Sequence, residues 1–405
     1  MSRFFLLCSL VLYTLSGQAW AAIGPADQDK IIDKIAEILE AKYIHAEVAH
    51  EMVAIMEKNR EDYHALTQHR TLAERLNHDL FAVSKDHHVR VLYTGPGVDA
   101  MSAFFTAESN YKFVKAETLP GNIGYLRMDE FSTHEEVREV AEAAMAFLAN
   151  TDALIIDLRF NRGGSGDLAT LILSYFFEKP TVINEYFYRW SGKSSHYKTH
   201  KKVAGRRLVG KPLFVLTSRY TASAAEIFAN TVKTFELGTL VGEKTFGIAN
   251  VADFAAVGQG FSLLFTHGED KNPITGTNWQ GTGITPDVAC DLDEAPAQAH
   301  RLAWSQVSDQ QNGTPWSARA MSAFFNPVPP ENLATLAGQY GGTTVLVKDG
   351  ELFMQKEHYP AYRLRPIGDA TFVLADTEGS FLLSFRADKL ITTYANGDTV
   401  EQTRE

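Results

Sequence analysis

The sequence is poor in cysteine and has no excess of positive charge. Of its 405 residues only two are cysteine, and 38 Lys and Arg stand against 49 Asp and Glu, a net charge of −11. Two thiols cannot form a disulfide framework, so stability must come from packing. Without a basic block the chain lacks a surface for phosphate groups, which argues against a nucleic-acid partner. With 45% hydrophobic and 21% charged residues, disorder is excluded.

The first 21 residues have the pattern of a secretory signal peptide. A short basic start is followed by an apolar run over residues 4–15 and by the small-x-small sequence Ala19-Trp20-Ala21. The run is shorter than the roughly 20 residues that span a bilayer, although an N-terminal anchor or a buried helix is the alternative. We expect an exported protein, periplasmic or secreted, with no transmembrane anchor after cleavage and with Cys290 as its single thiol.

Hydrophobic spacing divides the rest into three parts. Residues 22–92 predict a helical domain, because apolar residues recur every three or four positions. Residues 93–305 predict an α/β domain with a largely parallel sheet, because buried strands alternate with helices. A proline-rich linker at 326–330 precedes short alternating segments, so residues 326–405 predict a small β domain. In the α/β part we expect strands at 89–93, 124–128, 153–158, 213–216 and 239–241, and helices at 137–148, 168–177 and 222–235.

The histidines of the helical region are the first candidates for a metal site. They are irregularly spaced and lack Cys or Glu partners at metal-ligand spacing, so we interpret them as solvated side chains. No metal and no cofactor are expected. These histidines are His45, His50, His64, His69 and His78.

Ser223 is the first candidate for catalysis. The strand predicted at 213–216 leads through a polar turn into a helix that begins at or just after Ser223. An oxyanion formed there would face unpaired backbone N–H groups and the positive end of the helix dipole. The alternative is a structural role, in which Ser223 caps the helix and Glu226 completes a capping box.

A pair of glycines, Gly163 and Gly164, follows the strand predicted at 153–158. Paired glycines let the backbone turn sharply and present N–H groups to an anion or a carbonyl oxygen. A phosphate-binding loop is the competing interpretation, but both the Gly-x-x-x-x-Gly-Lys-Ser/Thr pattern and the three-glycine dinucleotide pattern are missing.

Four short blocks follow one another in the sequence: Asp157-Leu158-Arg159-x-Asn161-x-Gly163-Gly164, Thr221-Ala222-Ser223-Ala224-x-Glu226, Gly242-Glu243-x-Thr245-x-Gly247 and Gly283-Ile284-x-Pro286-Asp287. Together and in this order they resemble the tail-specific, or C-terminal processing, serine peptidases. The resemblance covers about residues 28 to 290, and the segment 272–279 is similar to the branch related to interphotoreceptor retinoid-binding protein and the tricorn core peptidase. It implies a crotonase/ClpP-like α/β core with an N-terminal helical domain and a small C-terminal β domain. Residues 91–124 are too few to hold a PDZ domain.

The resemblance implies roles for the residues of these blocks. Ser223 becomes the nucleophile, and the oxyanion hole is formed by the backbone N–H groups of Gly163 or Gly164 and of Ala224. The processing peptidases activate their serine with a lysine 25 positions later. Here that position is Ile248, whose aliphatic side chain cannot accept a proton.

The base must therefore come from another residue. Lys244 is near in sequence but occupies a variable position of its block. Asp86-x-His88, followed by a strand, resembles the segment that supplies the histidine in the retinoid-binding-protein-like and tricorn-like branches. His88 is therefore the candidate general base, since a neutral imidazole can take the serine proton. A surface histidine at the domain junction is the structural alternative.

A catalytic histidine is usually oriented by a third group. In the tricorn-like pattern this is a glutamate, and its position here is Gln280. The amide oxygen of Gln280 could accept a hydrogen bond from the imidazole, although a neutral group stabilises an imidazolium less than a carboxylate does. Asp86 and Glu243 are alternative orienting groups.

These features predict an exported serine peptidase that cleaves peptides or unfolded protein tails through an acyl-enzyme. A non-catalytic peptide- or lipid-binding protein on the same scaffold is the alternative, because Ile248 and Gln280 both stand where relatives carry charged catalytic groups. The sequence does not specify the oligomeric state.

Overall fold

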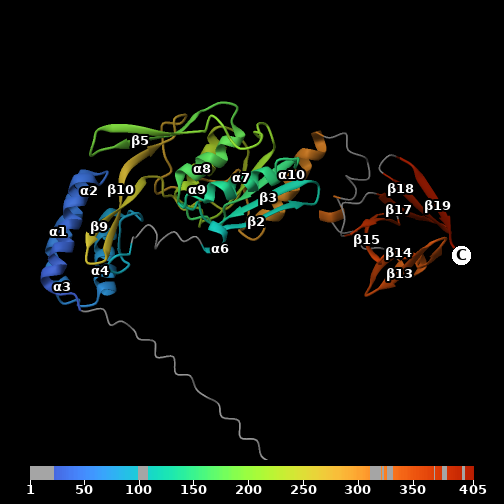
Figure 1. The fold of residues 1–405 in the computed structure, drawn as a ribbon, viewed down its shortest axis with the longest axis horizontal. Coiled ribbons are helices and arrows are strands. Elements are labelled where there is room, and N and C mark those ends of the chain that lie inside the picture. The colour runs from blue at the N-terminus through green and yellow to red at the C-terminus, as the bar shows by residue number, and fades with distance from the viewer. Residues whose placement is uncertain are drawn as a thin grey trace, which may run out of the picture. The chain divides into compact units, whose positions relative to one another are not determined.

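The computed structural model describes residues 22–98, 108–310, 321, 323–325, 332–368, 370–375, 381–394 and 397–405 (Figure 1). The predicted signal peptide, with Cys8, and the linker at 326–330 lie outside the described residues. The chain forms two compact units, of which the first runs to residue 103 and includes 252–267, and the second holds 104–251 and 268 onward. No helix in the described residues is both long and apolar enough to cross a membrane.

The first unit confirms the helical prediction for the N-terminal region. Ile31, Ile35 and Leu39, spaced by three and four residues, are all fully buried, as expected for one face of an amphipathic helix. The helices are α1 (Pro25–Lys42), α2 (Ala46–Lys58), α3 (Arg60–His64) and α4 (His69–Ser84).

Strands complete this unit. The strand expected at 89–93 is present as β1 (Arg90–Tyr93), whereas the contribution of residues 252–267 to this unit was not predicted. Strand β1 pairs antiparallel with the first part of β10 (Phe261–Lys271), and β9 (Val251–Gly258) also pairs with β10. Leu263 and Phe265 of β10 share one core with the helices. An apolar helix face must be covered, and these alternating strand residues cover it.

The second unit is built on a six-stranded sheet with strand order β11-β8-β7-β4-β3-β2. Every neighbouring pair is parallel except β2 and β3, which confirms the largely parallel sheet. All residues of β4 and β7 are buried, as their unbroken apolar runs predict. The strands are β2 (Phe113–Leu119), β3 (Ile123–Met128), β4 (Ala153–Asp157), β7 (Leu213–Thr217), β8 (Thr239–Gly242) and β11 (Val288–Ala289).

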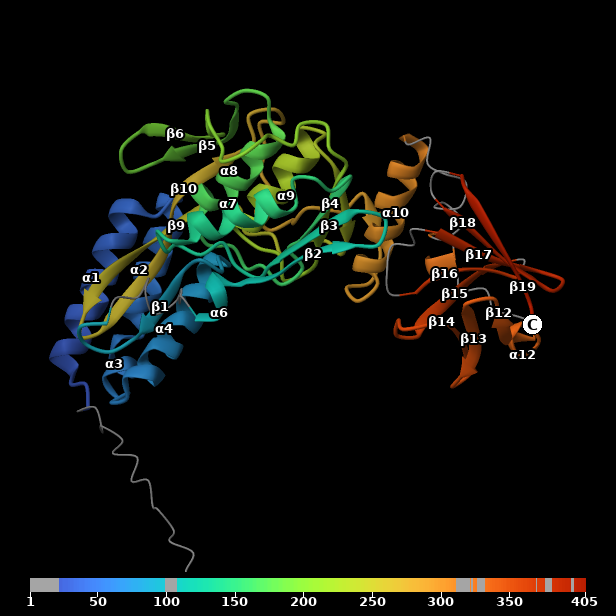
Figure 2. The same ribbon diagram turned by 45° about the vertical axis from the view of Figure 1, so that its right-hand side comes forward.

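Helices cover both faces of this sheet (Figure 2). Ile156 of β4 packs with α7, α8 and α9, whereas its neighbour Ile155 packs with α10, because successive strand residues point to opposite faces. The helices are α7 (Val137–Phe147), α8 (Gly166–Leu173, continued by a 3-10 turn, Ser174–Phe176), α9 (Ala224–Thr234) and α10 (Ala295–Gln310), and a short α6 (Glu108–Tyr111) precedes β2. A hairpin of β5 (Val182–Tyr188) and β6 (Lys193–Lys198) pairs with the end of β10.

The C-terminal residues form one eight-stranded antiparallel sheet in chain order, preceded by a short helix α12 (Leu333–Leu336). This confirms the predicted β structure, and a bridge between Tyr340 and Arg404 joins the first strand to the residue after the last. The strands are β12 (Gly338–Tyr340), β13 (Thr343–Lys348), β14 (Glu351–Lys356), β15 (Tyr362–Gly368), β16 (Thr371–Leu374), β17 (Phe381–Arg386), β18 (Lys389–Tyr394) and β19 (Thr399–Thr403).

Candidate active site

The glycine turn and Ser223 lie against each other at the carboxyl edge of the parallel sheet. Gly163 follows β4 and Ser223 follows β7, and these strands are neighbours. A Cβ at Gly163 would lie 2.7 Å from the Ser223 Cβ, 2.9 Å from the Ala222 carbonyl oxygen and 3.1 Å from the Ala224 nitrogen. Two blocks about 60 residues apart in sequence therefore meet where α/β sheets usually place their functional groups.

The backbone of Ser223 is strained. Ser223 is the residue before α9 and has φ 54° and ψ −124°, a combination that costs an L residue about 1–3 kcal/mol. A serine that only caps a helix normally has an extended backbone. Strain at a sharp turn from a strand into a helix is instead typical of a nucleophilic serine. The conformation of Ser223 is thus unusual for a residue that only caps a helix, although the capping box that pairs Ser223 with Glu226 is also present.

Glu226 ties the turn of Ser223 to the next loop. Its carboxylate, fully buried, accepts hydrogen bonds from the backbone N–H groups of Ser223 (3.0 Å), Gly247 (2.7 Å) and Ile248 (2.8 Å), and from the Thr245 hydroxyl (2.5 Å). Burial raises the pKa of Glu226 to about 7, while these four hydrogen bonds favour the ionised form and oppose the rise. The hydrogen bond from the Ser223 backbone N–H to the Glu226 carboxylate is the one expected of a capping box.

The two glycines differ in whether their backbone N–H has a hydrogen-bond partner in the described residues. The Gly163 N–H donates to the side-chain oxygen of Asn161 at 2.9 Å. The Gly164 N–H donates to no other atom in the described part of the chain. Ala224 is the first residue of α9, so its N–H is one of the four that a helix leaves without an intrahelical partner. Gly164 and Ala224 are thus the available pair.

Asn161 has a role that the sequence blocks alone did not assign. Its side-chain nitrogen donates to the Met128 carbonyl at the end of β3 (3.0 Å), while its side-chain oxygen holds the Gly163 N–H. The block that starts at Asp157 also contains a buried ion pair, in which Arg159 contacts Asp157 at 2.7 Å. These contacts fix the glycine turn relative to the sheet.

Replacing Gly163 with alanine tests this packing. The new Cβ would clash with the Ser223 Cβ, and the residue would have to keep φ +102°. We expect kcat/KM for a peptide substrate to fall by about 100-fold or more, and the free energy of unfolding by about 1–3 kcal/mol. Gly205→Ala is the matched control, since Gly205 has φ +73° with nothing within 4 Å of its Cβ position. It should lower stability without lowering kcat/KM, and an equal activity loss in both variants would contradict the packing argument.

Ile248 occupies a buried position beside the Ser223 backbone. The same carboxylate oxygen of Glu226, Oε2, accepts from the N–H groups of both residues. The Ile248 side chain is 9% exposed, whereas Lys244 is exposed to solvent. The position that carries a lysine in the processing peptidases is thus filled by an aliphatic side chain.

Gln280 does not have a free acceptor for an imidazole, contrary to our expectation from the sequence. Its amide oxygen accepts from the backbone N–H groups of Ala249 (2.8 Å) and Asn250 (3.2 Å). An amide oxygen has two lone pairs, and both are taken. The alternative orienting group Glu243 forms an ion pair with Arg219 at 3.0 Å.

His88 lies in the first unit, in the turn before β1, whereas Ser223 lies in the second. Asp86 organises that turn, because its Oδ1 accepts from the His88 backbone N–H at 2.9 Å. Its Oδ2 accepts from the hydroxyls of Tyr43 (3.1 Å) and Thr266 (2.6 Å). Asp86, buried at 5% exposure, thus fixes the backbone that carries His88.

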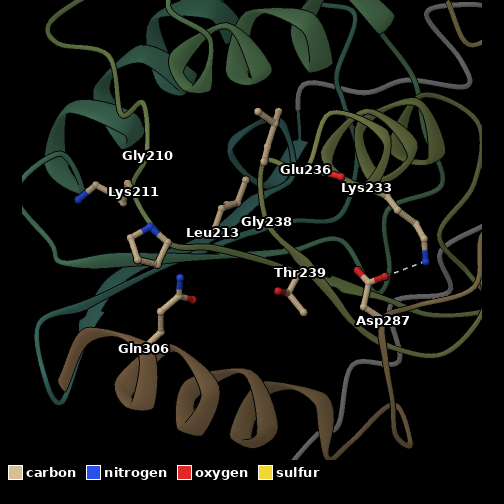
Figure 3. A pocket seen from close by; sticks show the side chains of 11 residues that line it. Gly210, Lys211, Leu213, Lys233, Glu236, Gly238, Thr239, Asp287 and Gln306 are labelled. Atoms are coloured by element: carbon tan, nitrogen blue, oxygen red, sulfur yellow. Dashed lines mark hydrogen bonds and ion pairs between the residues drawn. The ribbon is translucent and has the colours of Figure 1, made fainter. Parts of the chain in front are cut away.

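A separate pocket of about 490 Å³ lies at the opposite edge of the sheet (Figure 3). Its lining includes Leu213 and Thr239, the first residues of β7 and β8. An ion pair between Lys233 and Asp287, 2.8 Å apart, borders it. Because Ser223 follows the carboxyl end of β7, this pocket is not part of the candidate active site.

Comparisons with known proteins find related peptidases. A carboxy-terminal-processing protease of Bartonella bacilliformis is 28% identical over 239 residues, which cover 54% of this chain and 51% of the relative. A tail-specific protease of Haemophilus influenzae is 31% identical over 123 residues, 30% of this chain and 16% of the relative. The chain thus spans about half the length of the first relative and less of the second.

A solved structure of a lipoprotein from Streptococcus agalactiae has a similar fold. The TM-score is 0.53 at 15% identity, and the match covers 75% of this chain and 100% of the lipoprotein chain.

Two family models match adjoining parts of the sequence. Residues 122–290, which contain Ser223 and both glycines, match the model of peptidase family S41. Residues 26–114, which contain the four N-terminal helices and His88, match the model of the N-terminal domain of this family in eukaryotic IRBP. With the four blocks in order and the glycine turn packed on Ser223, the chain belongs to peptidase family S41 and carries an N-terminal domain of the IRBP type.

Proposed function

We propose that this chain is a serine-type peptidase that hydrolyses peptide bonds in peptides or unfolded protein tails through an acyl-enzyme. The observation that carries the proposal is the strained Ser223 turn, with Gly163 packed against it. Gly164 and Ala224 are the residues that directly follow Gly163 and Ser223. The names of the two relatives, a processing and a tail-specific protease, support the choice of substrate class.

The proposed reaction starts with attack of the Ser223 hydroxyl oxygen on the scissile carbonyl carbon. The hydroxyl proton passes to the imidazole of His88, and the N–H groups of Gly164 and Ala224 hold the resulting oxyanion. When the tetrahedral intermediate collapses, the C–N bond breaks and the leaving amine takes the proton from His88. A water molecule then attacks the ester in the same way and releases Ser223.

His88 is proposed as the base because Ile248 cannot accept a proton. Asp86 accepts hydrogen bonds from the His88 backbone N–H and from the Thr266 hydroxyl, which supports a defined position for the backbone that carries this side chain. Since Gln280 binds backbone N–H groups, we propose no third catalytic residue.

The finer assignments of the sequence analysis remain part of this proposal. They comprise a crotonase/ClpP-like core in residues 93–305, a signal peptide in residues 1–21 and export to the periplasm or the medium. The parallel sheet with helices on both faces supports the first of these.

Labelling with a biotinylated fluorophosphonate tests the nucleophile. We expect the folded wild-type chain to be labelled, with the adduct mapped to Ser223 by mass spectrometry. Ser223→Ala should not be labelled, and Ser194→Ala, which changes an exposed serine of β6, should be labelled like the wild type. A folded wild-type chain that takes up no label at Ser223 would overturn the proposal.

A non-catalytic binding protein is the second candidate, and the buried Ile248 beside Ser223 favours it. This candidate predicts tight binding of a peptide or lipid that Ser223→Ala leaves unchanged, together with no turnover of any member of a peptide library. Cleavage of a library peptide by the wild type and not by Ser223→Ala would exclude it.

A further inference from the structure

Four consecutive backbone N–H groups, those of residues 247–250, are held by only two side chains. Glu226 accepts from the first two, at 2.7 and 2.8 Å. Gln280 accepts from the next two, at 2.8 and 3.2 Å. This loop, which we call the clamped loop, is thus fixed from one side by α9 and from the other by the segment around Gln280.

The segment around Gln280 is itself rigidly attached to the clamped loop. The Gly281 N–H donates to the Gly247 carbonyl at 2.8 Å. A Cβ at Gly247 would lie 2.9 Å from the Gly283 nitrogen, so the two backbones are in direct contact. Asn278 completes the support, since its side-chain oxygen accepts from the Gln280 N–H (3.1 Å) and its nitrogen donates to the Asp270 carbonyl (2.8 Å).

The clamped loop is connected to the Ser223 turn through Glu226. Oε2 of Glu226 accepts from Ile248 in the loop and from Ser223 at the start of α9. A shift of the loop would therefore move Glu226 and the strained Ser223 backbone with it. Displacement of a nucleophile by about 1 Å can cost 100-fold in rate.

We propose that Gln280 is a positioning residue that, together with Glu226, fixes the clamped loop and through it the Ser223 turn. This inference rests on the proposed function and changes the role that the sequence suggested for Gln280. A neutral amide suits the position, because the adjoining half of the loop already surrounds one buried acid, Glu226. The amide oxygen supplies two hydrogen bonds without adding a second charge to a buried site.

Paired substitutions of Gln280 separate positioning from orientation of the base. Gln280→Met keeps the length and removes the acceptor, so we expect the rate of fluorophosphonate acylation and kcat to fall by about 10- to 100-fold, with KM within about twofold. Gln280→Glu keeps an acceptor oxygen but adds a second charge, so we expect its activity to lie between those of Gln280→Met and the wild type, with an unchanged acidic limb of the pH profile of kcat/KM. Gln306→Met, the same change at an exposed position of α10, should behave as wild type.

Hydrogen exchange gives a readout that does not depend on catalysis. The amides of Ala249 and Asn250 should exchange faster in Gln280→Met than in the wild type, because their acceptor is lost. Should Gln280→Met fail to fold, Gln280→Asn, which keeps the amide but withdraws it by one methylene, gives the same comparison. Faster exchange in a chain that turns over no peptide would uphold the clamp and reject the proposed function.

Two results would overturn the positioning role. One is Gln280→Glu with a higher kcat/KM and a displaced acidic limb, since a carboxylate that orients an imidazole stabilises its charged form. The other is Gln280→Met with unchanged amide exchange and unchanged acylation.

Discussion

Ser223→Ala is expected to lower kcat for peptide hydrolysis by about 10⁴- to 10⁶-fold, because it removes the only proposed nucleophile. The remaining rate would come from the N–H groups of Gly164 and Ala224 and from substrate binding. Ser223 also belongs to the capping box of α9, so the free energy of unfolding should fall by no more than about 0.5–2 kcal/mol, which leaves the chain folded. The measurement is steady-state cleavage of a quenched fluorescent peptide library.

Ser194→Ala serves as the control for nonspecific effects of losing a serine hydroxyl, and it should cleave at the wild-type rate. A Ser223→Ala chain that cleaves peptides within tenfold of the wild type would show that the nucleophile lies elsewhere.

His88→Ala is expected to reduce kcat/KM by about 1,000-fold or more, because the serine hydroxyl would lose its proposed proton acceptor. Ile248→Lys in the same chain is then expected to restore part of the activity. The backbone N–H groups of Ile248 and Ser223 donate to the same carboxylate oxygen of Glu226, so the backbone of a lysine at position 248 would lie close to the proposed nucleophile. Lysine must be neutral to act as a base and its ordinary pKa is about 10.4, so the restored rate should rise toward alkaline pH.

Ile248→Met is the matched control for this rescue, since methionine is unbranched and cannot accept a proton. It should leave His88→Ala inactive, and melting temperatures of all variants would show whether they fold. Full activity of His88→Ala would show that His88 is not the base. Rescue by methionine as well as by lysine would show that the restored activity does not come from proton transfer to the lysine.

Much of the fold could be predicted because its signals are local. The unbroken apolar runs of β4 and β7 predict strands buried on both faces, and the spacing of Ile31, Ile35 and Leu39 predicts a helix. That residues 252–267 belong to the first unit could not be predicted from local signals. Those strands join the N-terminal helices through contacts such as that of Leu263, which depend on chain segments far apart in sequence.

The four ordered blocks of the sequence by themselves determined the family, and they identified Ser223, the glycine pair and Ile248 as the candidate site positions. Only the tertiary structure decided which atoms remain available for chemistry. The side-chain oxygen of Asn161 accepts from the Gly163 N–H. The amide oxygen of Gln280 accepts two hydrogen bonds from backbone N–H groups of the clamped loop. The physical reason is that hydrogen bonds are directional and saturable. The residue type determines how many hydrogen bonds a side chain can donate or accept. The tertiary structure determines which partners occupy those positions.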